Sequence, residues 1–289
     1  TTQFLKALHE DGHITFVGDS HSQGEYHNRC YWECDIAQVN ALALTDDIVE
    51  FMALQLQKLP FETQQVLKLA ACIGNQFDLA TLTIVSERSS TDAATVLWKA
   101  LQEGLILPTS QVYKFFQNAE QTDIQSSANP TYRFLHDRVQ QAAYSIIAVD
   151  QKQATHLKIG QLLQQNLSEI EKEEKLFDIV GHLNLGRDLI VDDLHRIQLI
   201  QLNISAGEKA RKSTAYEAFK SYLTIAKESF VNSEWNHQYE LMFKVHKLLA
   251  EAEQLNNNFQ ESEKLILTTL EKAKTDLEQA ELYSLWIVQ

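Results

Sequence analysis

Proline and glycine are scarce in this sequence, which contains three prolines and nine glycines among 289 residues. Sandwiches and barrels built from many short strands need turn residues at short intervals, so this scarcity disfavours them and favours long helices. Hydrophobic residues make up 44% of the chain, which is enough for sizeable cores. We therefore expect a mainly α-helical protein of about two domains.

Positive charge is also in short supply, because the formal net charge is -14 and the pI is near 5.1. Proteins bind nucleic acids and anionic membranes through lysine and arginine, which displace counterions from phosphates. No apolar run approaches the roughly 18 residues of a membrane-spanning helix, and no signal segment opens the chain. The composition predicts a cytoplasmic protein that binds neither nucleic acid nor membrane.

Cysteine is rare as well, and Cys30, Cys34 and Cys72 form an odd set without the spacing of a disulfide framework, which predicts reduced thiols. His21 and His27 lie shortly before the first two cysteines, and nitrogen and sulfur donors at such gaps can hold zinc. The spacing H-x5-H-x2-C-x3-C matches no common zinc finger. We therefore predict no metal site, while the question of metal binding by these four residues stays open.

Residues 1–44 begin with a helical pattern, TTQFLKALHEDG, that ends at Gly12. The apolar run ITFV follows, and after a polar stretch, GDSHSQGEYHNR, the run CYWECDI again has strand composition. This order predicts a hairpin-like excursion. Because the sequence opens inside a helical pattern, we expect it to be a segment of a longer protein.

Residues 45–135 have the signals of several helices followed by a short hairpin. Helices are predicted from Thr45 to Pro60, from there to Gly74, over LATLTIVSE, and from about Thr91, capped by Ser90 or Thr91, to Gly104. The runs LILP, VYKFF and YRFL then read as strands. Helices followed by a small β-hairpin are typical of a winged-helix domain. We expect its inward-facing residues to include Met52, Leu54, Cys72 and Trp98.

Residues 136–289 are helical in pattern throughout. The predicted helices span residues 136–148, 151–166, 172–185, 192–212, 214–230, 234–256, 259–275 and 277 to the end. The spacing of Ala218, Tyr222 and Ile225 returns in Ser262, Ile266 and Thr269, where a small residue would let neighbouring helices approach. The recurrence predicts an α-helical, tetratricopeptide-like solenoid, with Trp235 in its core.

Four stretches carry a family resemblance: LPFETQQVLKLAACIGNQFDLATLTIVSE, LWKALQEGLILP, YRFLHDRVQQAAYSII and THLKIGQLLQQN. They resemble the region downstream of the ATPase core in large multidomain signalling proteins, especially cyanobacterial ones. These proteins are predicted AAA/STAND-type ATPases that often carry a serine/threonine kinase domain ahead of the ATPase, with GAF and sensor histidine kinase domains of two-component systems behind. The resemblance implies that residues 1–44 end an ATPase lid, and that ATP and magnesium belong to the parent protein.

The triplet His136-Asp137-Arg138 invites comparison with a kinase catalytic loop, but that loop reads H-R-D and is followed by D-F-G, which is absent here. At the start of a helix, Asp137 is favoured by the helix dipole, and its neighbours can brace a joint. We interpret the triplet as a buried or half-buried structural element. No G-x-x-x-x-G-K-[ST] occurs either. The sequence predicts no catalytic, cofactor-binding or metal-binding residues, and no enzyme activity in this chain.

The function predicted is regulatory: the winged-helix part would relay the nucleotide state of an ATPase core, and the repeats would bind protein partners or neighbouring domains. The alternative is a transcriptional activator whose winged helix reads DNA. The third winged helix offers only Lys99, beside Asp92 and Glu103, and the wing adds Lys114, which is a weak basic face. Lys68 and the cluster GEKARK, residues 207–212, are expected to be solvated.

Overall fold

The computed structural model describes residues 5, 9, 12, 14–17, 31–34, 48–109, 129–231, 235 and 237–287. The chain forms two compact units, Thr1–Ile147 and Ala148–Gln289. The described residues are mainly helical with little strand, which confirms the predicted fold class. None of the helices among them combines the length and apolar character needed to cross a membrane.

An antiparallel hairpin of strands β1 (Ile14–Val17) and β2 (Tyr31–Cys34) confirms the two predicted N-terminal strands. Phe16 lies opposite Trp32, and their rings meet edge to face with centroids 5.2 Å apart. Cys34 is a free, exposed cysteine. The other residues of the open zinc question, His21, His27 and Cys30, lie outside the described residues.

Five helices of the first unit are described: α3 (Ile48–Gln57), α4 (Phe61–Ile73), α5 (Leu79–Ser86), α6 (Ser90–Gln102) and α7 (Asp137–Ser145). α4 starts directly after Pro60 and ends at Gly74, as predicted. The Asp78 side chain caps α5 by accepting a hydrogen bond from the Thr81 amide. α6 is capped by Ser89, and not by Ser90 or Thr91 as predicted, because the hydroxyl of Ser89 accepts from the Asp92 amide.

A three-stranded antiparallel sheet joins β3 (Gln76–Asp78), β5 (Thr131–Phe134) and β4 (Ile106–Pro108) in that order. The predicted strands LILP and YRFL therefore pair with each other, while the predicted strand VYKFF lies outside the described residues. β3 was not predicted, because QFD is too short for alternation to show. Phe77 on β3 stacks on Tyr132, and both are buried together with Phe134.

The start of the predicted repeats differs from the division between the two units. α7, which His136 begins, packs on α3 and α4 within the first unit. Its buried residues Val139, Ala142 and Ala143 face these helices, and Gln140 donates to the Ala71 carbonyl of α4 at 2.9 Å. The predicted three-part division, with residues 1–44, 45–135 and 136–289, stays a prediction.

Three predicted burials in the first unit have different outcomes. Cys72 is a buried core residue, as expected. Leu54 is 52% exposed and Trp98 is 41% exposed, so placing both among the inward-facing residues was wrong. α6 turns Ala93, Leu97 and Ala100 inward instead, and Trp98 lies outside this buried face.

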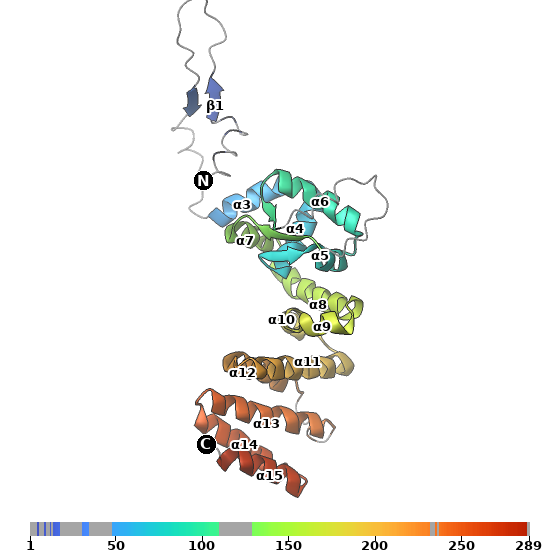
Figure 1. Ribbon diagram of the computed structural model, residues 1–289, viewed down its shortest axis with the longest axis vertical. Coiled ribbons are helices and arrows are strands. Elements are labelled where there is room, and N and C mark those ends of the chain that lie inside the picture. The colour runs from blue at the N-terminus through green and yellow to red at the C-terminus, as the bar shows by residue number, and fades with distance from the viewer. Residues whose placement is uncertain are drawn as a thin grey trace, which may run out of the picture. The chain divides into compact units, whose positions relative to one another are not determined.

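The second unit consists of successive packed helices, which Figure 1 shows as layers from α8 to α15. Each helix packs on the next in the orders α8, α10, α11, α12 and then α12, α13, α14, α15. The bounds are α8 (Val149–Asn166), α9 (Glu169–Glu174), α10 (Leu176–Leu185), the short 3-10 helix η2 (Arg187–Leu189), α11 (Asp193–Lys212), α12 (Tyr216–Glu228), α13 (Tyr239–Leu255), α14 (Phe259–Leu270) and α15 (Asp276–Ile287).

The repeated spacing holds in α14 and is displaced by one residue in α12. Ser262, Ile266 and Thr269 are all buried. In α12 the buried set is instead Phe219, Leu223 and Ala226, one position after the predicted set. The displacement buries the large Phe219 ring beneath α11, where Gly207 leaves space for it. Trp235 packs against this core, as predicted.

Candidate partner-binding groove

The His136-Asp137-Arg138 triplet is exposed, so its predicted burial was wrong. Its helix-capping position is clear, since the His136 ring nitrogen accepts a hydrogen bond from the Arg138 amide at 3.2 Å. Asp137 is the first helical residue, where the helix dipole favours a carboxylate. Arg138 donates to Gln141 one turn later. The triplet thus caps α7, with its contacts inside its own helix.

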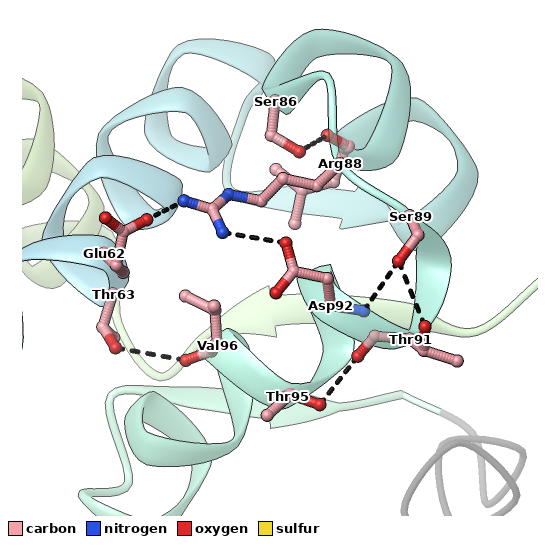
Figure 2. A network of polar contacts seen from close by, with 10 residues as sticks. Glu62, Thr63, Ser86, Arg88, Ser89, Thr91, Asp92, Thr95 and Val96 are labelled. Carbon is pink, nitrogen blue, oxygen red and sulfur yellow. Dashed lines mark hydrogen bonds and ion pairs between the residues drawn. The ribbon is translucent and has the colours of Figure 1, made fainter. Parts of the chain in front are cut away.

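The turn between α5 and α6 is fastened by Arg88, which Figure 2 shows between two carboxylates. The guanidinium pairs with Glu62 of α4 and, at 2.8 Å, with Asp92 of α6. Lys99, the basic residue of α6, pairs with Glu103 at 2.9 Å. A helix that reads DNA needs cations directed at phosphates. Here both cations already have carboxylate partners, which disfavours the DNA-binding alternative.

The GEKARK cluster was expected to be solvated, but its residues connect helices. Gly207 and Ala210 are buried in the core of α11. Arg211 holds Glu251 of α13 through two contacts of 2.7 Å and covers the Phe219 ring. Lys209 donates to the Glu173 carbonyl and lies over the Phe177 ring. The partners of Lys209 and Arg211 are distant in sequence and close only in the fold. The charge pattern of the sequence therefore could not predict these contacts.

A hollow of about 780 Å³ opens between α8, α9 and α11. We call this hollow the amide end. Uncharged polar side chains are prominent in its lining: Gln161, Gln164, Gln165, Gln198 and Ser205. Each glutamine amide has both donor and acceptor groups. Two further lining residues contact carboxylates, since Lys172 pairs with Glu169 and the His195 ring lies 2.7 Å from Asp192. This lining can hydrogen-bond a polar chain.

A second hollow, of about 580 Å³, lies between α11 and α13 and adjoins the first. Lys244 of its lining pairs with Glu208 of the amide end at 3.1 Å. At its far side, the Lys274 ammonium lies 3.7 Å above the Tyr239 ring. The hydroxyl of Tyr239 donates to Glu278 of α15 at 2.8 Å, and burial of that hydroxyl raises its pKa.

A third hollow, of about 890 Å³, lies between α13 and α15. Its lining is the most apolar of the three, and we call it the apolar end: Leu255, Phe259, Leu277, Ala280 and Leu285. Lys247, one turn after Lys244 on α13, also lines it. α11 lines the first and second hollows and α13 lines the second and third, and we call the three hollows together the inner groove.

Long polar side chains join the helices α11, α13 and α15 along this groove. Between α13 and α15, Lys247 pairs with Glu281 at 2.7 Å, and Gln254 donates to the Leu285 carbonyl at 3.4 Å. The pairs Glu208–Lys244 and Arg211–Glu251 do the same between α11 and α13. These bridges connect the helices while leaving space between them, and they pair the charged side chains that they join.

Metal chemistry finds no support within the described part of the chain, where no cluster of three or more histidine, cysteine, aspartate or glutamate side chains could hold an ion. The burial of two histidines was not predicted from the sequence. His156 and His182 are buried between α8 and α10, and their Nδ1 atoms lie 2.8 Å apart. Burial lowers the pKa of both, that of His182 to about 4. Both therefore stay neutral at pH 7.

Comparison with known proteins shows a similarity between this chain and a signalling protein. The chain is 31% identical over 288 residues to Hybrid signal transduction histidine kinase G of Dictyostelium discoideum. The match covers 85% of this chain but only 8% of that protein. No protein-family model matches the sequence.

Proposed function

We propose that this chain is a non-catalytic, regulatory interaction segment of a multidomain signalling protein. The similarity to a hybrid signal transduction histidine kinase, of which the chain spans 8%, supports a place inside a large signalling chain. The inner groove supports the interaction role, since helical repeats that stack side by side create an extended binding surface. The observation that carries the proposal is this groove, kept open by polar bridges between α11, α13 and α15.

The first unit would act as the relay. Its helices and three-stranded sheet follow one another in the order α4, β3, α5, α6, β4, β5, which supports the winged-helix interpretation. We propose that it packs against an AAA/STAND-type ATPase core of the parent protein, and that the second unit is a tetratricopeptide-like solenoid. ATP and magnesium would bind that core, because this sequence has no phosphate-binding loop.

Coupling requires that the ATPase core bind this segment differently in its two nucleotide states. The test is a pull-down of the purified ATPase core of the parent protein by this chain, with ADP and with a non-hydrolysable ATP analogue. We expect at least a fivefold difference in the amount retained. Equal retention in both states would overturn the relay.

A DNA gel shift at increasing salt concentration distinguishes the proposed interaction segment from the alternative, a DNA-binding transcriptional activator. Binding that weakens steeply with salt would reveal phosphate contacts and support the transcriptional activator. We expect no shift, because Arg88 and Lys99 are paired with carboxylates.

A further inference from the structure

We propose that the apolar end of the inner groove binds an α-helix of a partner protein, and that this helix presents an uncharged, apolar stripe to the groove. The inference rests on the proposed function, because it names the kind of partner that the groove takes. The occupant could instead be an extended peptide, a charged segment or a second copy of this chain. The chemistry of the lining decides among these.

The apolar end exposes large hydrophobic side chains from three helices. Leu277 of α15 is 72% exposed, Phe259 of α14 is 45% exposed and Leu255 of α13 is 36% exposed. On α15, the lining residues Leu277, Ala280 and Ser284 recur at helical spacing, so they form one face. Exposed apolar side chains gathered in a hollow are typical of a site for another apolar surface.

The backbone of the occupant decides between a helix and a strand. An extended segment has free N–H and C=O groups that must find partners when buried. Among the lining residues of the apolar end, the uncharged polar side chains are Gln254 and Ser284, and Gln254 already donates to the Leu285 carbonyl. A helix satisfies its backbone internally. The apolar end therefore suits a helix, whereas the amide end offers the hydrogen-bonding groups that an extended chain requires.

The charges of the walls specify the contact face of that helix. Lys247 pairs with Glu281, and Glu251 pairs with Arg211, both at 2.7 Å. A charge brought into the hollow would lose water and would meet only carboxylates and ammonium groups that are already paired. The complementary face is therefore apolar and uncharged, as in other helices that bind hydrophobic grooves.

The test uses the full chain and a fluorescein-labelled synthetic peptide of 18 residues. The peptide is an amphipathic helix with leucines on one face and alternating lysine and glutamate on the other, and a scrambled peptide of equal composition serves as its control. Fluorescence polarisation measures binding. We expect the amphipathic peptide to bind at least tenfold more tightly than the scrambled one.

Two variants locate the site. Leu277→Glu places a charge in the hollow and should weaken binding at least tenfold, and Ala280→Trp should do the same by filling it. The matched control is Leu194→Glu, because Leu194 is an equally solvent-facing leucine of α11, 80% exposed, outside the hollows of the groove. It should leave binding unchanged. Circular dichroism confirms that all three variants fold.

Three results would overturn the inference: equal binding of both peptides, unchanged binding by Leu277→Glu, or a dimer in sedimentation equilibrium that this substitution abolishes. The last would identify a second copy as the occupant. Since the peptide assay involves neither nucleotide nor ATPase core, it can fail while the relay stands. The relay can likewise fail while the peptide binds.

Discussion

The first helix pair of the second unit, α8 with α10, and a later pair, α13 with α14, close by different means. In the first, Gly160 and Gly186 bring the backbones together, since a Cβ on either would lie within 2.7 Å of Leu183 or Leu157. In the later pair, the buried Ser262 hydroxyl donates to the Ala250 carbonyl at 2.9 Å. One repeated architecture thus relies on missing side chains at one place and on a hydrogen bond at another.

The largest expected effect comes from adding a methyl group at the glycine contact. In Gly186→Ala the new Cβ would lie 2.6 Å from the Leu157 Cβ and 2.8 Å from the Gln153 carbonyl oxygen. Neither is the flexible end of a side chain, so α8 must move. We expect a loss of about 3 kcal/mol in the free energy of unfolding, measured by urea denaturation.

The control for this substitution lies in the same segment. A Cβ at Gly181 of α10 would meet nothing within 4 Å. Gly181→Ala should therefore stabilise the protein by about 0.5–1 kcal/mol, because alanine is the better helix former. If both substitutions had the same effect, close approach would not be what joins the first pair.

The second prediction concerns acid stability, which should depend on the first pair. The hydrogen bond between His156 and His182 needs one Nδ1–H and one bare Nδ1, so the two rings cannot both be protonated. Burial lowers the pKa of both, Lys152 lowers that of His156 further, and that of His182 is about 4. The unfolded chain, with histidine pKa values near 6.5, binds protons first.

The stabilisation from the neutral pair is therefore complete above about pH 6.5 and is lost as the pH falls toward 4. On η2, which packs on α8 and α10, Asp188 accepts from Gln153 and Arg187 pairs with Glu228. The side-chain amide of Asn203 on α11 donates a hydrogen bond to the side-chain oxygen of Asn184 on α10.

Thermal unfolding of wild type and His182→Gln at pH 7 and pH 5 checks this. Wild type should lose on the order of 2 kcal/mol more than the variant between these pH values. Gly181→Ala is the control, because Gly181 lies on α10 and the substitution replaces no titratable group. It should keep the wild-type pH dependence. An unchanged slope in His182→Gln would show that the pair does not govern acid stability.

The third prediction concerns the later pair. Ser262→Ala removes the donor to the Ala250 carbonyl and leaves that acceptor buried. The loss should be about 1 kcal/mol, well below that of Gly186→Ala. A matched control is Thr268→Ala, because the Thr268 hydroxyl is exposed and only donates back to Lys264 within α14. Thr268→Ala should change the free energy of unfolding by less than about 0.5 kcal/mol. A loss at Ser262 equal to that at Gly186 would erase the contrast between the pairs.

The sequence predicted helices well and the groove poorly, for a physical reason. Apolar periodicity and punctuation by Pro60 and Gly74 are local signals, and they placed α4 correctly. The spacing also identified Ser262 as a small buried residue at a helix contact. These signals depend on neighbours within a turn or two of the chain.

Features that depend on distant partners were missed. Arg211 was expected to be solvated because its partner, Glu251, is 40 residues away. Trp98 was placed in the core because it is large and apolar, although α6 packs through smaller residues. His156 and His182 gave no local signal, since only the packing of α8 on α10 brings them together. A helical hydrophobic pattern indicates which side is buried, but not what meets it.

The smallest expected effect concerns the turns that close the later pairs, which share one geometry. Thr214, after α11, and Asn257, after α13, both have left-handed backbones, with φ of 58° and 61°. After each, the next amide bonds the carbonyl five residues back, from Ala215 to Ala210 and from Asn258 to Glu253. Asparagine tolerates this conformation, but β-branched threonine is strained in it.

Thr214→Gly should therefore stabilise the protein by about 0.5–1 kcal/mol, even though its hydroxyl loses a hydrogen bond to the Ser213 carbonyl. Asn257→Gly should change stability by less than about 0.5 kcal/mol, because asparagine already accepts this backbone. Urea denaturation of both variants measures the difference. If Thr214→Gly were destabilising, the hydrogen bond of the Thr214 hydroxyl would contribute more to stability than the strained backbone costs. The two turns would then have the same geometry but be stabilised by different interactions.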